Sequence, residues 1–173
     1  GTGPWASTCW PLITQVGDPW HLFLAAYTWA KLQPDSALSS RVLVCFLGAD
    51  LLNAALKWPL QGDRPFWLAP HTPQQFSITC ETGYGMPSGH VMATAAVCGA
   101  LAKHHGGAVS WAVWGGVVCL IGVSRVYVAA HLPLQTLCGA ALGWVCTCAV
   151  ERLYSGIEHC SWTPGSGLAA VPL

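Results

Sequence analysis

Five apolar stretches divide this chain, each near or somewhat below the about 20 residues that a membrane-spanning helix needs. They cover residues 19–30, 42–60, 89–102, 108–126 and 132–150. Pro, Gly and polar residues separate them, at residues 33–36, 61–85, 106–107 and 131–133. Only 8% of the residues are charged and 53% are hydrophobic, so water is a poor solvent for most of the chain. The sequence therefore predicts an all-α, polytopic membrane helical bundle with about five transmembrane helices.

Basic residues mark one side of this predicted bundle. Those in or beside the first connection, the third connection and the end of the fifth stretch are Lys31, Arg41, Lys103 and Arg152. The positive-inside rule places them on the cytoplasmic side. Because each helix reverses the direction of the chain, the loop 61–85 and the turn around His131 then open on the opposite, extracytoplasmic face.

Three further cations, Lys57, Arg64 and Arg125, are expected on that opposite face, against the charge bias. A Lys or Arg within a membrane segment costs about 2.5–3.5 kcal/mol on insertion scales, which makes such residues functional candidates. Asp50 and Asn53 share one face of the second stretch with Lys57, since they are spaced three and four residues apart. The alternative is an ion pair between Asp50 and Lys57 that only stabilises the bundle.

The cations and a helix start together favour phosphate binding. A phosphoryl group spreads negative charge over three oxygens, so a site without metal needs several fixed cations and donors. Lys57, Arg64 and Arg125 supply the charge. Ser88 is a good N-cap residue, and Gly89 lets the backbone approach a ligand closely, so the first amides of this helix can also hold the anion.

Two histidines, His90 and His131, complete the candidate site. Attack on phosphorus needs a nucleophile, and an alkoxide leaving group needs a proton. Gln135 lies one helical turn after His131 and can accept a hydrogen bond from one ring nitrogen, so we assign His131 as the nucleophile and His90 as the general acid. Each histidine alone is better explained as a helix-start or interface residue; only the joint arrangement favours catalysis.

The sequence predicts neither a metal nor another cofactor. It contains no His-x-x-x-His pair, no Cys-x-x-Cys pair and no acidic cluster, and Glu81 is one of few carboxylates close to the motifs. The net charge is zero, so nucleic acid is not expected as a partner.

The motifs resemble a known signature. Lys-x6-Arg-Pro, Pro-Ser-Gly-His and Ser-Arg-x5-His occur in this order in the phosphatidic acid phosphatase type 2 and vanadium haloperoxidase superfamily. Their flanks resemble the glucose-6-phosphatase catalytic subunits, in the segments Asp50 to Trp58, Gly62 to Trp67, Cys80 to Gly83 and Ser124 to His131. Gln135 supports this resemblance, because the wider group usually has aspartate at this position whereas the glucose-6-phosphatases carry glutamine. The segment Gly62 to Trp67 is most similar to the ubiquitously expressed paralogue. Tyr84 and Met86 depart from the family's usual proline and serine.

The resemblance implies an endoplasmic-reticulum membrane enzyme with a lumenal active site, a phosphohistidine intermediate and no metal. Members of that family have about nine membrane helices, so the chain is expected to be a fragment or a shortened form. We expect residues 1–153 to form the membrane-embedded phosphatase domain, and residues 154–173 to form a polar, irregular tail.

Three functions remain open at this point. The first is hydrolysis of glucose 6-phosphate, with membrane lipid around the protein and a glucose 6-phosphate transporter as a candidate partner. The second keeps the reaction but acts on a lipid phosphate or another sugar phosphate. The third is a truncated, catalytically silent membrane protein. A soluble vanadate-binding oxidase is opposed by the hydropathy.

Overall fold

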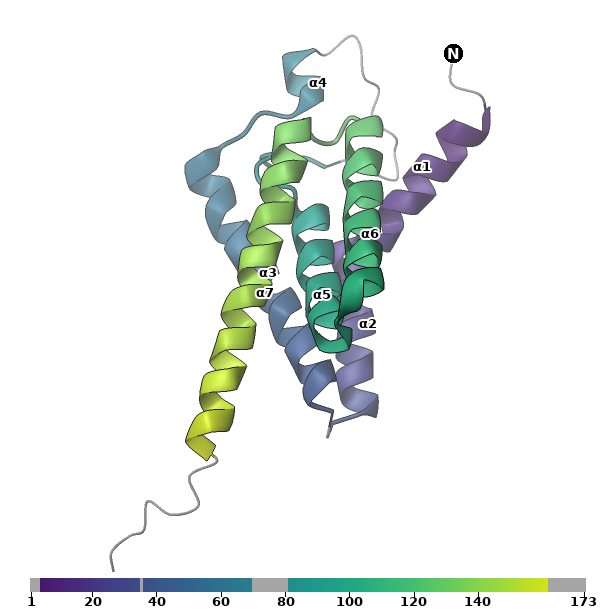
Figure 1. Ribbon diagram of the computed structural model, residues 1–173. Coiled ribbons are helices and arrows are strands. Elements are labelled where there is room, and N and C mark those ends of the chain that lie inside the picture. Colours follow the sequence, from purple (N-terminus) through teal and green to yellow (C-terminus); the bar gives the residue numbers. More distant parts are fainter. Residues whose placement is uncertain (1–3, 35, 70–80, 162–173) are drawn as a thin grey trace, which may run out of the picture.

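The computed structural model describes residues 4–34, 36–69 and 81–161, and Figure 1 shows its arrangement. The described residues form helices and loops with no strand, which confirms the predicted all-α class. The helices are α1 (Pro4–Val16), α2 (Pro19–Leu32), α3 (Ala37–Leu60), α4 (Pro65–Leu68), α5 (Gly89–His105), α6 (Gly107–Tyr127) and α7 (Pro133–Ser161). Each of the five apolar stretches therefore lies within, or largely within, one helix.

Helix α5 is the centre of the bundle, packed against α2, α3, α6 and α7 (Figure 1). It is rich in alanine and almost completely buried. Gly139 and Gly143 of α7 let the two backbones meet: a Cβ at Gly139 would lie 2.6 Å from the carbonyl oxygen of Ser88, and one at Gly143 would overlap the carbonyl oxygen of Met92. This spacing of small residues is typical of closely packed membrane helices.

Three helical segments of the described chain are long and apolar enough to cross a membrane, namely Ala37–Leu68, Gly107–Tyr127 and Pro133–Ile157. Together with the helical bundle they make this a multi-pass membrane protein. Helices α2 and α5 are shorter, at 14 and 17 residues.

Two helices lie outside the predicted stretches, and one runs further than predicted. Helix α1 has 13 residues with Pro4 and Pro11 among them, and α4 has four, so both are too short to be recognised as membrane-spanning stretches. Helix α7 ends at Ser161, so residues 154–161 are helical, where an irregular tail is predicted from residue 154. The helix continues because Tyr154 packs against the core and its ring lies 5.1 Å from the Arg41 guanidinium. Residues 162–173 lie outside the described part.

The polar connections gather at one end of the bundle, as the sidedness argument predicts. The end of α3, the turn α4, the start of α5 and the turn between α6 and α7 all lie towards this end (Figure 1). At the opposite end Arg41 of α3 lies 3.4 Å from Glu151 of α7.

A tight corner between α1 and α2 reaches this polar region. Asp18 caps α2, since its Oδ1 accepts hydrogen bonds from the amides of Trp20 and His21, at 2.9 and 3.3 Å. Pro19 occupies the first turn, where no amide donor is needed. Gly17 packs directly against α5 and α6: a Cβ there would lie 2.6 Å from Ile121 and 3.0 Å from Thr94 Oγ1.

Candidate active site

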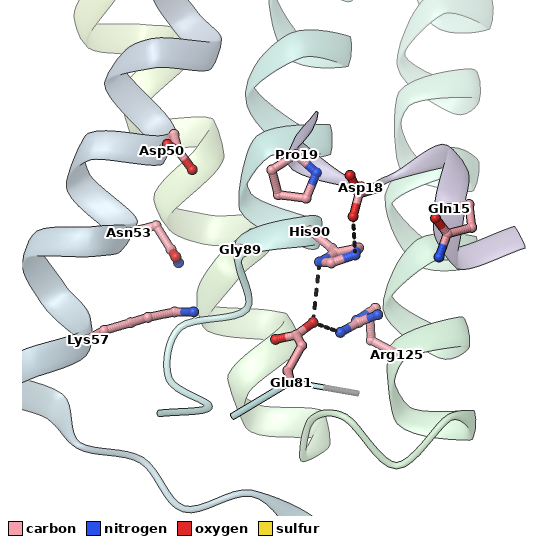
Figure 2. Close-up of a pocket in the computed structure, with 10 residues that line it drawn as sticks. All are labelled: Gln15, Asp18, Pro19, Asp50, Asn53, Lys57, Glu81, Gly89, His90 and Arg125. Atoms are coloured by element: carbon pink, nitrogen blue, oxygen red, sulfur yellow. Dashed lines mark hydrogen bonds and ion pairs between the residues drawn. The ribbon is translucent and has the colours of Figure 1, made fainter. Parts of the chain in front are cut away.

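A polar cavity of about 280 Å³ opens between the α1–α2 corner, α3, α5 and α6 (Figure 2). It is lined by Gln15, Asp18, Pro19, Asp50, Asn53, Lys57, Glu81, Gly89, His90 and Arg125. Six of these ten are site residues predicted from the sequence, namely Asp50, Asn53, Lys57, Gly89, His90 and Arg125. The remaining predicted residues, Arg64, Ser88, His131 and Gln135, lie beside the cavity, linked to it by the contacts below.

The Glu81 carboxylate lies where the cations and histidines converge. Its Oε2 is 2.7 Å from Arg64 Nη2, and its Oε1 accepts a hydrogen bond from Arg125 Nη2. The two imidazoles are a little further away: His90 Nδ1 is 3.7 Å from Oε1, and His131 Nε2 is 3.9 Å from Oε2. Burial alone would raise the pKa of Glu81, but Arg125, Arg64 and the histidines lower it to about 2, so this carboxyl is an anion.

Arg64 is completely buried, and backbone carbonyls hold most of its guanidinium in place. Its Nη1 donates to the carbonyl of Ala130 at 2.8 Å, Nε donates to Gly83, and Nη2 also reaches Tyr84 at 3.3 Å. Arg64 therefore ties the loop that carries Glu81 to the turn that precedes His131. It can meet an anion only at the position that the Glu81 carboxylate takes.

Arg125 comes from the last turn of α6 and is also completely buried. Its Nη1 donates to Thr14 Oγ1 at 3.0 Å, so a residue of α1 holds the guanidinium. Its Nη2 points to Glu81 and the cavity (Figure 2).

His131 has one supported ring nitrogen and one open one. Nδ1 lies 2.8 Å from the Gly85 carbonyl and 3.3 Å from Gln135 Oε1; both are acceptors, so the proton belongs on Nδ1. Nε2 is buried and has no hydrogen-bond partner among the described residues. Burial lowers the pKa of His131 to about 3, despite the opposing effect of Glu81, so the ring is neutral at pH 7 with a free lone pair on Nε2.

Gln135 does contact His131, but the closer partner of the ring is the Gly85 carbonyl. The Gln135 amide mainly joins loops: Oε1 accepts from the Leu132 amide at 3.0 Å, and Nε2 donates to the Asp63 carbonyl at 2.6 Å. Gly85 leaves room for this amide, since a Cβ there would lie 2.7 Å from Gln135 Oε1.

The start of α5 carries further polar groups. Ser88 has the backbone conformation of an N-cap, but its side chain makes no capping bond, and its buried Oγ has no partner among the described residues. That hydroxyl is free to meet a ligand oxygen. Asn53 of α3 holds this segment, since its Nδ2 donates to the Pro87 carbonyl at 3.1 Å. Gly89 is needed there, because a Cβ would lie 3.1 Å from Asn53 Oδ1.

Lys57 and Asp50 both line the cavity from α3 (Figure 2). Within the described part of the chain no hydrogen bond or ion pair joins them, so the alternative of a structural Asp50–Lys57 pair is not supported. Lys57 instead points towards the centre of the cavity.

Residues of the site without a predicted role include Thr14, Asp18, Glu81 and Gly85. Glu81 could have been suspected as a carboxylate near the motifs. Gly85 acts through its backbone carbonyl, and Thr14 and Asp18 belong to a segment without any motif, so no sequence signal marks them. In the described residues no group of three or more His, Cys, Asp or Glu side chains could hold a metal ion.

A polar pocket beside two buried arginines and two histidines, built at one end of a helical membrane bundle, defines the class of protein. The family model of the PAP2 superfamily matches residues 39–157, and the chain belongs to this superfamily. Two solved structures have the same fold. The first transmembrane PAP2 type phosphatidylglycerolphosphate phosphatase from Bacillus subtilis gives a TM-score of 0.69 at 24% identity, covering 90% of this chain and 79% of that one. Aquifex aeolicus LpxE gives a TM-score of 0.73 at 19% identity, covering 88% of each chain.

Among curated proteins, the chain is similar to glucose-6-phosphatases. It is 35% identical to glucose-6-phosphatase 3 of Bos taurus, over 83% of this chain and 49% of that protein. It is also 36% identical to glucose-6-phosphatase catalytic subunit 1 of Haplochromis nubilus, over 66% of this chain and 40% of that protein. The chain thus spans about half the length of the curated relatives that it matches.

Proposed function

We propose that this chain hydrolyses a phosphate monoester through a covalent phosphohistidine on His131. The observation that carries the proposal is the position of the Glu81 carboxylate, which lies between two buried arginines and two imidazoles. A site that stabilises one carboxylate between such groups suits a phosphoryl group, which carries more charge over three oxygens. Lys57, the Ser88 hydroxyl and the amides beginning at Gly89 add donors on the cavity side.

The two histidines divide the chemistry. The lone pair on His131 Nε2 forms the nitrogen–phosphorus bond while the phosphorus–oxygen bond to the leaving group breaks. His90 gives its proton to the departing alkoxide. In the second step His90 takes a proton from water, the water oxygen attacks phosphorus, and the nitrogen–phosphorus bond breaks to release phosphate and restore His131.

We propose glucose 6-phosphate as the substrate. The similarity to glucose-6-phosphatases supports this choice, and so does the cavity wall, where Gln15, Asp50 and Asn53 offer polar groups to sugar hydroxyls. A lipid phosphate is the second candidate, favoured by the name of the phosphatidylglycerolphosphate phosphatase that shares the fold. A third possibility is a chain that is catalytically silent without the remaining half of its relatives' length.

The site's surroundings follow from the same resemblance. We propose that the protein lies in the endoplasmic-reticulum membrane with the cavity facing the lumen, and that a glucose 6-phosphate transporter supplies the substrate. The basic residues at the other end of the bundle support this orientation.

The test uses the purified chain in detergent. Phosphate release is measured with glucose 6-phosphate, other sugar phosphates and a lipid phosphate, each with and without EDTA, and acid-quenched protein is analysed for phosphohistidine. Turnover that survives EDTA, and an adduct lost in His131→Ala, would support the proposal. Absence of turnover in the intact chain would favour the silent alternative.

A further inference from the structure

We propose that Asp18 is the positioning residue of His90, holding its imidazolium by the ring nitrogen that faces away from the phosphate. This inference rests on the proposed function, since it assumes that His90 transfers the protons. It adds the corner between α1 and α2 to the catalytic machinery.

The two oxygens of Asp18 have separate partners. Oδ1 accepts the amide hydrogen bonds that begin α2, from Trp20 and His21. Oδ2 lies 3.5 Å from His90 Nε2, and the dashed line in Figure 2 marks this contact. The helix cap therefore fixes the direction of the carboxylate, and its second oxygen faces the ring.

The two nitrogens of His90 face different anions. Nδ1 lies 3.7 Å from Glu81 Oε1, on the side where the phosphate is expected, and Nε2 faces Asp18. His90 is only 11% exposed, so these contacts are poorly screened. The charged and titratable groups around the ring are Asp18 from the corner, Glu81 from the loop, Arg125 from α6, Lys57 from α3 and His131.

The supports of the two histidines differ in charge, and this difference matches their proposed roles. His131 is backed by the neutral Gly85 carbonyl and the Gln135 amide, which suit a nucleophile that starts as a neutral ring. His90 is backed by a carboxylate, which stabilises the imidazolium that a proton donor must carry. Burial, Arg125 and Lys57 all favour the neutral ring, and the Glu81 and Asp18 carboxylates on its two sides oppose them.

The corner is held rigidly enough to aim Asp18. Gly17 lies in direct contact with Ile121 and Thr94, and Thr14, one turn earlier, binds Arg125. Asp18 precedes the segment 39–157 that defines the superfamily match, so the matched segment alone lacks this support.

The variant Asp18→Asn tests the proposal, because asparagine is an equally good N-cap but carries no charge. With an alkyl phosphate such as glucose 6-phosphate, kcat should fall about 10- to 100-fold, a part of the 10²–10⁴-fold that a general acid contributes. With p-nitrophenyl phosphate, whose leaving group needs no proton, the initial burst of nitrophenolate should keep its wild-type rate while the later steady state slows. Glu151→Gln, at the other end of the bundle, is the matched control and should leave both substrates unaffected.

Equal loss of the burst and of alkyl phosphate turnover would overturn the proposal, because it would indicate a purely structural role. Absence of turnover in the wild type would instead refute the proposed function. A second measurement then decides the inference: histidine carbon-13 NMR in detergent, with His90 assigned by its loss in His90→Gln. The His90 titration midpoint should move to lower pH in Asp18→Asn, by on the order of one pH unit. An unchanged midpoint would overturn the proposal.

Discussion

The Glu81 carboxylate lies 2.7 Å from Nη2 of Arg64, a side chain with no exposed surface. Arg125 binds the other carboxylate oxygen. One residue of a loop thus pairs with two buried arginines at the point where both histidines converge. A phosphate that binds there must compete with Glu81 for these guanidinium groups.

Replacing this carboxylate should make the site depend on phosphate for its stability. In Glu81→Gln the two arginines lose their anion, and we expect the free energy of unfolding to fall by about 3 kcal/mol. Added inorganic phosphate should then raise the melting temperature of the variant more than that of the wild type, because no internal anion competes. Thermal unfolding in detergent measures both effects. Equal phosphate shifts in the two proteins would rule out competition.

The stability difference between the wild type and Glu81→Gln should depend on pH. The pKa of Glu81 is lowered from 4.5 to about 2, so its ion pairs stabilise the folded state fully above pH 4.5 and are lost as the pH falls towards 2. The stability difference between wild type and Glu81→Gln should therefore be constant from pH 7 to 5 and shrink below pH 4.5. The pKa of His131 is about 3, so its titration does not enter the comparison between pH 7 and 5. A difference that keeps its full pH 7 value at pH 2.5 would contradict the assignment.

Thr14 should act on phosphate binding through Arg125. Thr14→Val keeps the shape of the side chain but removes the hydroxyl that lies 3.0 Å from Arg125 Nη1. A hydrogen bond to a charged group contributes about 1.5–3 kcal/mol, so we expect KM to rise about tenfold or more. Thr14→Ser retains the hydroxyl and should restore most of the affinity. An unchanged KM in Thr14→Val would show that this contact from α1 does not support phosphate binding by Arg125.

Gln135 should matter more for the loops than for the chemistry. Gln135→Ala leaves the Gly85 carbonyl on His131 but removes the partners of Leu132 and Asp63. We expect a stability loss of about 1–3 kcal/mol and a residual turnover well above that of His131→Ala. Melting temperature and phosphate release are measured on the same preparations. If Gln135→Ala were as inactive as His131→Ala, the amide itself would be the essential support.

The contact between α5 and α7 predicts a sharp difference between two glycines. In Gly139→Ala the new Cβ meets the Ser88 carbonyl at 2.6 Å, so the helices must separate, at a cost of about 1–3 kcal/mol. The start of α5 carries His90, so activity should fall as well. Gly115→Ala in α6 is the control, because a Cβ there has nothing within 4 Å. Similar melting temperatures for the two variants would disprove the close packing.

The sequence predicts the helices well, because hydropathy fixes the apolar stretches. It also singles out the motif cations, because a cation inside such a stretch is costly without a function. It predicts interactions less well. Helical spacing predicts Gln135 as the partner of His131, but the nearer acceptor is the backbone carbonyl of Gly85. Every residue has a backbone carbonyl, so the sequence does not mark this one. Ser88 is placed at a helix start by its type, yet the tertiary packing leaves its hydroxyl without a capping bond.

The first helix illustrates a different limit. Residues 4–16 contain two prolines, and their polar residues interrupt the apolar pattern, so local propensity argues against a helix there. Its packing against α6 outweighs that propensity. The contributions of Thr14 and Asp18 depend on where this helix ends in space, which no spacing rule within a single segment can give.

Gly139 and Gly143 of α7 also determine which parts of the site can be substituted to accept other substrates. Since α5 and α7 meet backbone to backbone beside Ser88, the relative placement of the two imidazoles is set by main chain and depends little on side-chain choice. The opposite wall is lined by side chains of α3 and the first corner, of which Asp18 and Asn53 contact His90 and the start of α5. New substrates can therefore be accommodated by exchanging other residues of that wall, such as Asp50, while the reacting nitrogens keep their alignment.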